Sequence, residues 1–178
     1  TRGELLASCN RIVHGLRALG LGKGDVVAAV LPNDAAIIEL YLAVAQAGMY
    51  LVPINWHLTA PEIAYIVQDS EAKVFVAHER FGDACKKAAT ELDFAPERRF
   101  AVGKVDGFRP FAELSAGQPA TTPGERAAGA LRAALPDHAH HPDLVPQVQV
   151  IGGFVQQHDF RGLDQQGGES QAPRFAAG

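Results

Sequence analysis

Histidine side chains gather near the C-terminal end of the sequence, where imidazole rings could bind a transition metal. Imidazole nitrogens are ligands for Zn, Ni and Cu, and nearby carboxylates can complete a coordination sphere. The group consists of His138, His140, His141, His158, Asp137 and Asp143. Its spacing matches no structural zinc module, and clustered histidines in a flexible loop commonly bind metals adventitiously. We therefore predict no built metal site here.

Two glycine-containing segments have the composition of phosphate-binding loops. Residues 20–25 read GLGKGD, and such segments cradle phosphate when they join a strand to the N-terminus of a helix. Here a helix precedes the loop and a strand follows it, so we predict a connecting turn instead. Thr121, Thr122 and Gly124 offer hydroxyls and a flexible backbone, but no lysine occurs after Lys104. We therefore assign no phosphate site to this second segment either.

Other signatures of catalysis are missing from the sequence. It contains no G-x-S-x-G nucleophile elbow, no G-x-G-x-x-G fingerprint and no Walker lysine motif. A solvated helix face or a helix cap explains Glu39, Glu62 and Asp69, and His14 lies beside an apolar helix stripe without an evident role. We therefore assign no catalytic residue, no cofactor-binding residue and no metal ligand.

Composition limits the class of protein. The 178 residues suit one domain, and 47% of them are hydrophobic, enough to bury a core. A net charge of -4 argues against a nucleic-acid partner. Cys9 and Cys85 lie far apart without metal-type spacing, so we predict two reduced thiols and a cytoplasmic protein. Polar residues interrupt the longest apolar run, residues 35–54, so we expect no transmembrane segment. We also expect no signal peptide before it.

Helix starts are marked by capping boxes, in which a Thr is followed three residues later by a Glu. Thr1 with Glu4 and Thr59 with Glu62 fit this pattern, and Asn33 or Asp34 could cap a helix between them. Apolar residues recur at helical spacing in the first two of these helices, which predicts a buried stripe on each. The predicted stripe residues are Leu5, Leu6, Cys9, Ile12, Val13, Leu16 and Leu19, followed by Ile37, Ile38, Tyr41, Leu42, Val44 and Ala45.

Short apolar runs between the helices predict parallel strands. These runs are Val26–Leu31, Tyr50–Ile54, Lys73–Ala77 and Arg99–Val102, with a further helix at residues 80–92. Strands that alternate with helices predict a three-layer α/β fold, a mainly parallel sheet flanked by helices. In such sheets ligands bind at the carboxyl ends of the strands, here near Asn33, Asn55 and His78.

Three segments together resemble the N-terminal part of acyl-CoA synthetases, which are adenylate-forming, AMP-binding ligases. The segments are GDVVAAVLPN, AVAQAGMYLVPIN and LTAPEIAYIVQDSEAKVFV, in the family's order and spacing. The resemblance implies a parent chemistry in which ATP, with Mg, activates a carboxylic or fatty acid to an acyl-adenylate before transfer to coenzyme A. Trp56 and His57 stand where family members show a variable residue and Arg. We expect His57 to be structural.

The family's phosphate loop, of the type TSGTTGxPKG, is absent from the sequence, which reads TTPGER near its expected place. The resemblance covers about residues 1–115, so we predict an N-terminal family subdomain at 1–117 and a low-order, irregular tail outside the family at 118–178. Within the tail, residues 145–155 could form one strand. A reading-frame change or early stop in a synthetase gene would produce such a chain.

These patterns leave three classes of function open. The first is an N-terminal fragment of an acyl-CoA synthetase that is inactive alone and needs no cofactor of its own. The second is a non-catalytic interaction module, which could self-associate through apolar surface that missing subdomains leave exposed. The third is an independent small α/β ligand-binding protein or enzyme. The sequence does not fix the preferred acyl chain.

Overall fold

The computed structural model describes residues 1–126 and 130–131. The α-helices of this part are α1 (Arg2–Ala18), α2 (Ala35–Gln46), α3 (Ala60–Asp69) and α4 (Gly82–Glu91). The strands are β1 (Val26–Val30), β2 (Tyr50–Pro53), β3 (Val74–His78), β4 (Arg99–Val102), β5 (Arg109–Pro110) and β6 (Ala130–Leu131). Short 3-10 helices lie at η1 (Glu79–Phe81), η2 (Pro96–Arg98) and η3 (Phe111–Leu114).

The strands form one sheet in the order β5-β4-β3-β1-β2-β6, and every pairing among the described residues is parallel. β1 lies between β2 and β3, and all five of its residues are buried. A strand covered on both faces needs no polar alternation, which explains its uninterrupted apolar sequence VVAAV. The predicted parallel sheet is confirmed.

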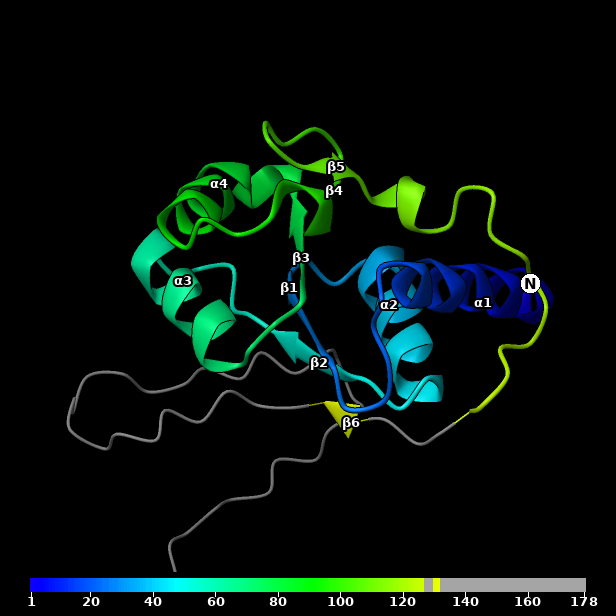
Figure 1. The fold of residues 1–178 in the computed structure, drawn as a ribbon. Coiled ribbons are helices and arrows are strands. Elements are labelled where there is room, and N and C mark those ends of the chain that lie inside the picture. The colour runs from blue at the N-terminus through cyan, green and yellow to red at the C-terminus, as the bar shows by residue number, and fades with distance from the viewer. Residues whose placement is uncertain (127–129, 132–178) are drawn as a thin grey trace, which may run out of the picture.

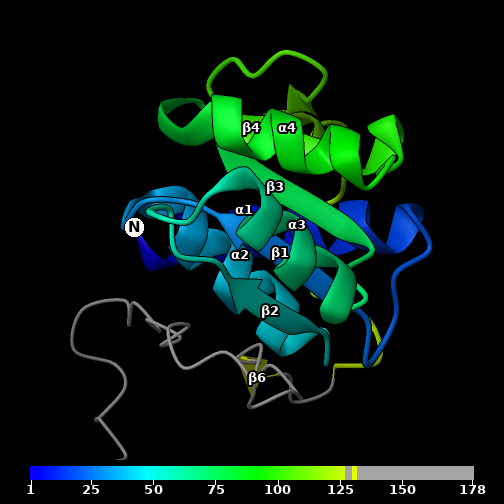
Figure 2. The same cartoon turned by 90° about the vertical axis from the view of Figure 1, so that its left-hand side faces the viewer.

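Helices cover both faces of the sheet and make three layers. α1 and α2 lie on one face, and α3 and α4 lie on the other (Figure 1). α3 and α4 run side by side across their face (Figure 2). Each face has its own apolar core, one around Leu16, Leu40 and Met49 and the other around Ile63 and Phe75. The predicted three-layer α/β fold is therefore confirmed.

Both predicted capping boxes are present. The amide of Glu4 donates to Thr1 Oγ1 at 3.3 Å, and the Glu4 carboxylate accepts from the amine of Thr1 at 2.6 Å. At the start of α3, Glu62 Oε2 accepts from both the amide and the hydroxyl of Thr59, each at 2.7 Å. The amides of Glu4 and Thr59 thereby gain acceptors that the helix backbone does not supply, and the contact of the Thr59 hydroxyl joins two side chains.

Three predictions of burial and one of helix extent are wrong. Leu6, Ile38 and Leu42, placed on buried stripes, are 51%, 44% and 39% exposed. The continuous helix predicted at residues 80–92 is divided into η1 and α4. His78 Nδ1 accepts from the amide of Arg80 at 3.1 Å, and this cap fixes a separate short turn before α4 begins at Gly82.

No helix among the described residues is long and apolar enough to cross a membrane. The strand predicted at 145–155 and the histidine group at 138–158 lie outside the described residues. Residues 118–126, predicted as tail, lie within the described part. Where the domain ends stays a prediction.

Candidate functional site

The carboxyl ends of β1 and β3 lie side by side in the sheet. Between these two strands the order in which the chain adds strands to the sheet changes direction. From β1 the chain passes through α2 to β2 on one side, and α3 then carries it back across β1 to β3. The helices that follow β1 and β2 cover opposite faces of the sheet (Figure 1). Open parallel sheets commonly bind ligands beside such a reversal. The carboxyl ends of β1 and β3 are therefore the candidate position for a site.

Asp34 and His78 lie close together at these strand ends. Asp34 Oδ1 accepts from the amides of Ala36 and Ile37 at 3.0 and 3.3 Å and so caps α2. Its other oxygen, Oδ2, lies 3.8 Å from His78 Nε2, within ion-pair range but too far for a hydrogen bond. Because His78 Nδ1 is an acceptor, the neutral ring carries its proton on Nε2, toward Asp34.

Aromatic side chains pack beside this pair. The rings of Trp56 and Phe81 stack with centroids 5.1 Å apart, and the His57 ring lies 3.4 Å from that of Trp56. The Phe81 ring is also 6.1 Å from the His78 ring. Trp56 and Phe81 are half-buried and pack against the core under α3 and α4. Trp56 and Phe81 therefore have a packing role, whereas His57 is exposed and its structural role stays a prediction.

Asn33 and Asn55 were also predicted near a site. Within residues 1–126, neither forms a hydrogen bond with Asp34 or His78. Asn55 Oδ1 accepts from the amide of His57 at 3.0 Å and so closes the turn after β2. Asn33 is exposed, one residue before the cap of α2. Within residues 1–126, the carboxyl ends of these strands bring no nucleophile into hydrogen-bond contact with a base. Asp34 and His78 alone could orient a polar ligand, but they do not form a catalytic set.

Removing the Asp34 carboxylate is expected to destabilise the protein mainly through the cap of α2. Asp34→Ala leaves the amides of Ala36 and Ile37 without their acceptor, which costs about 1 kcal/mol at a typical N-cap. Asp34→Asn keeps a capping oxygen, so its free energy of unfolding should fall by no more than a few tenths of about 1 kcal/mol. Urea denaturation measures both losses. Equal losses in the two variants would contradict the capping role.

The loop of residues 20–25 is closed by its own carboxylate. Asp25 Oδ2 accepts from the amide of Gly22 at 2.7 Å, and Oδ1 pairs with Lys73 Nζ at 2.6 Å. Burial alone would raise the pKa of Asp25, but the hydrogen bonds from Lys73 and Gly22 outweigh it and hold the pKa below its usual value. A stable negative charge at this position repels phosphate. The predicted connecting turn is thus supported.

The segment around Thr121 and Gly124 is bound to α1 through its carbonyl groups. Asn10 Nδ2 donates to the carbonyl of Ala120 at 2.9 Å, and a ring nitrogen of His14, Nε2, lies 3.1 Å from the carbonyl of Thr121. Arg17 donates to the carbonyls of Gly124 and Glu125 at 2.7 and 3.2 Å.

Carbonyls aimed at donors on a helix do not make the ring of amide donors that a phosphate needs. The anchoring side chains Asn10, His14 and Arg17 fall on one face of α1. His14 was predicted to have no role, and Asn10 and Arg17 were not among the candidate residues predicted from the sequence. Their spacing of four and then three residues was the available signal.

A family model described as AMP-binding enzyme matches residues 1–142. The chain belongs to the AMP-binding enzyme family. The match extends beyond the region of about 115 residues in which the sequence segments resemble acyl-CoA synthetases. It includes the anchored segment at residues 120–125 and β6.

Relatives in this family are ligases of carboxylic acids. The chain is 36% identical over 104 residues to the fatty acid–[acyl-carrier-protein] ligase ScoC of Streptomyces coeruleorubidus, covering 58% of this chain and 20% of that protein. It is 41% identical over 76 residues to the long-chain-fatty-acid–CoA ligase FadD13 of Mycobacterium tuberculosis, covering 43% of this chain and 15% of FadD13.

A solved structure shows the same fold in this family. It is a long-chain-fatty-acid CoA ligase from Rhodopseudomonas palustris, with a TM-score of 0.62 and 32% identity over 71% of this chain and 33% of that one. The chain therefore spans a fifth or less of the two sequence relatives and a third of this structure. It corresponds to the N-terminal region of adenylate-forming ligases.

Proposed function

We propose that this chain is the N-terminal scaffold of a ligase that activates a carboxylic acid, and that it does not catalyse activation alone. The observation that carries the proposal is that both glycine-containing segments are held by hydrogen bonds within the chain. Asp25 closes one of them, and the backbone carbonyls of the other are bound to α1. Neither fits a triphosphate, so no step of the reaction is derived from these residues.

The complete ligase would act on a carboxylic or fatty acid. In that chemistry the carboxylate oxygen attacks the α-phosphorus of ATP and pyrophosphate leaves, and a thiol then attacks the acyl carbon and AMP leaves. The names of ScoC and FadD13 support a fatty acid as the substrate class. Cys9 and Cys85 are both buried free thiols, which supports a reducing, cytoplasmic location.

The scaffold proposal can be tested by grafting. We would replace the whole N-terminal region of FadD13 that corresponds to this domain, of which 76 residues align in sequence, with residues 1–126 and measure pyrophosphate release with ATP, Mg, coenzyme A and palmitate. Activity within about a hundredfold of FadD13 is expected, because a misplacement near 1 Å costs on that order.

FadD13 without its N-terminal segment is the negative control for this graft. A chimera that is folded, shown by cooperative melting, and yet releases no pyrophosphate would contradict the proposal.

A non-catalytic interaction module remains a second candidate, because one observation favours it. Leu6, Ile38 and Leu42 expose large apolar side chains on the α1 and α2 face. Such surface normally marks a contact with another protein or domain. The scaffold proposal explains the same surface if the missing part of the ligase covers it.

A further inference from the structure

The two nitrogens of the His78 ring contact two different helices. Nδ1 accepts from the amide of Arg80 at 3.1 Å and so caps the 3-10 helix η1, which leads into α4. Nε2 lies 3.8 Å from Oδ2 of Asp34, the N-cap residue of α2. His78 is the last residue of β3, and its side chain is 13% exposed. One ring therefore joins the start of η1 to the start of α2.

The cap on η1 requires a neutral ring. A neutral imidazole carries one proton and keeps one acceptor nitrogen, whereas the charged ring has a proton on both nitrogens and accepts no hydrogen bond. The amide of Arg80 lies in the first turn of η1, where the helix backbone supplies no acceptor. A proton on Nδ1 would place two donors face to face at 3.1 Å. The charged ring must therefore leave the amide of Arg80.

The contact with Asp34 favours the opposite charge state of the same ring. At 3.8 Å the carboxylate is too far for a hydrogen bond, but a positive charge on the ring would attract it. Asp34 can receive this charge without leaving α2, because Oδ1 caps the helix while Oδ2 faces His78. The cap on η1 and the pair with Asp34 thus compete for the charge state of one ring.

The other charged or titratable groups near the ring have contacts of their own. The Glu79 carboxylate accepts from a backbone amide of the loop after β4 at 3.2 Å. The Arg80 guanidinium lies over an aromatic ring, 5.5 Å from its centroid. His57 lies against the indole ring that follows β2, with a centroid distance of 3.4 Å. Among the described residues, Asp34 is the acidic side chain within ion-pair range of His78.

We propose that His78 is a proton-operated switch between η1 and α2. In the neutral state, Nδ1 binds the amide of Arg80 and η1 is capped. When Nδ1 takes a proton from solvent, the ring releases this amide and turns its Nε2–H toward Asp34, so that the start of η1 opens. Histidine is the side-chain type that changes charge between about pH 5 and 8, which sets the range for a test. The switch does not depend on the proposed ligase function.

Opening of η1 would reach the aromatic side chains beside it. Phe81 is the last residue of η1, and its ring stacks on that of Trp56 at a centroid distance of 5.1 Å. Trp56 is the one tryptophan in the sequence, so tryptophan emission reports on this stack. The proposal therefore predicts a local change at η1 and a second change at the stacked indole.

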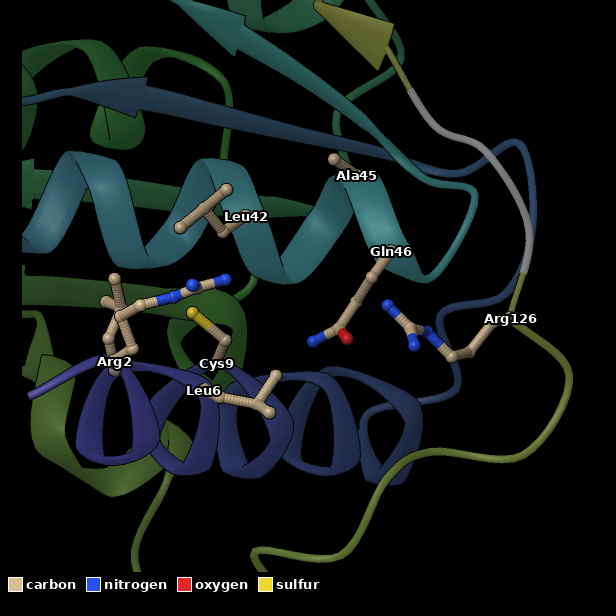
Figure 3. Close-up of a pocket in the computed structure, with 8 residues that line it drawn as sticks. Arg2, Leu6, Cys9, Leu42, Ala45, Gln46 and Arg126 are labelled. Carbon is tan, nitrogen blue, oxygen red and sulfur yellow. The ribbon is translucent and has the colours of Figure 1, made fainter.

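Amide exchange measured by NMR tests the switch in the unmodified 178-residue chain. Between pH 7.5 and 5.5, the protection factor of the Arg80 amide should fall about fivefold, the change expected for loss of one hydrogen bond. The 15N shifts of the His78 ring should show that it becomes charged over the same range. The amide of Leu42, in α2 beside the groove between α1 and α2 (Figure 3), is the internal reference and should keep its protection.

Two variants separate the two contacts of the ring. His78→Asn removes the titrating group but keeps a side-chain oxygen that can accept from the amide two residues later. Its Arg80 protection should therefore be the same at pH 7.5 and 5.5. Asp34→Asn keeps a capping oxygen for α2 and removes the charge, so the loss of protection at pH 5.5 should be smaller than in the parent. An equal loss in Asp34→Asn would overturn the role of Asp34.

Emission of Trp56 gives an independent measurement. It should change between pH 7.5 and 5.5 together with the Arg80 protection, and His78→Asn should abolish the change. All samples carry His57→Gln, because a charge on His57, whose ring lies against Trp56, could also alter the emission. A change that persists in His78→Asn would contradict the switch.

Constant protection of the Arg80 amide while the His78 ring becomes charged would overturn the proposal. A ring that stays neutral at pH 5.5 would overturn it as well, because the switch would then have no trigger in this range. A fall in the protection of Leu42 that equals the fall at Arg80 would show unfolding of the whole domain in acid, and would also overturn it.

Discussion

Phe75→Ala is expected to lower the free energy of unfolding by about 3–5 kcal/mol, the usual range for removing a buried aromatic ring. Phe75 lies in the middle of β3 and is fully buried under α3 and α4. The rings of Phe94 and Phe108 meet it edge-on, at centroid distances of 6.2 and 5.7 Å. Truncation removes both contacts and leaves a cavity that the rigid sheet cannot close.

The loss is a large share of the 5–15 kcal/mol that stabilises a typical domain. Chemical denaturation of Phe75→Ala measures it, and Phe75→Leu should lose clearly less because most of the volume is kept. Tyr65→Ala, at an exposed position on α3, should change stability by no more than about 0.5 kcal/mol. If Phe75→Ala were as mild as Tyr65→Ala, the core assigned to this face would be incorrect.

Gly15→Ala is expected to destabilise the protein by about 2 kcal/mol, although alanine is the better helix former. Gly15 lies inside α1, where η3 crosses the helix. A Cβ atom at this position would lie 1.7 Å from the carbonyl oxygen of Leu114 and 2.8 Å from its carbon. The gain in helix propensity is about 1 kcal/mol, and the forced shift of packed backbone costs more.

The matched control is Gly3→Ala in the same helix. A Cβ atom at Gly3 would meet nothing closer than Thr1 Oγ1 at 3.9 Å, so this variant should gain up to about 1 kcal/mol. Thermal melting of both variants therefore gives shifts of opposite sign. A stabilised Gly15→Ala would show that η3 does not pack against α1 as described.

Much of the fold follows from local sequence signals. The capping boxes at Thr1 and Thr59 fix two helix starts, and the strand predicted at Arg99–Val102 has those bounds in the structure. These features depend on residues close together in the chain. The η1 turn was missed because its cap is a ring nitrogen of His78, a residue type that sequence rules do not treat as a cap.

The candidate site could be predicted only in part. A site was expected at the carboxyl ends of β1, β2 and β3, near Asn33, Asn55 and His78, and His78 does lie at the end of β3. The approach of Asp34 to His78 depends on which strands are neighbours, and the sequence does not fix that order. The burial expected for Leu6, Ile38 and Leu42 failed because helical spacing marks apolar residues without saying what covers them.

Pyrophosphate release, compared between the 178-residue chain and its chimera with FadD13, is the measurement that tests the scaffold account most directly. The account predicts none above the protein-free blank from the folded chain across short to long fatty acids, and clear release from the chimera. Release of pyrophosphate by the chain alone would contradict the account, because residues 1–126 contain no loop that fits a triphosphate. A folded chimera that stays silent would contradict it equally.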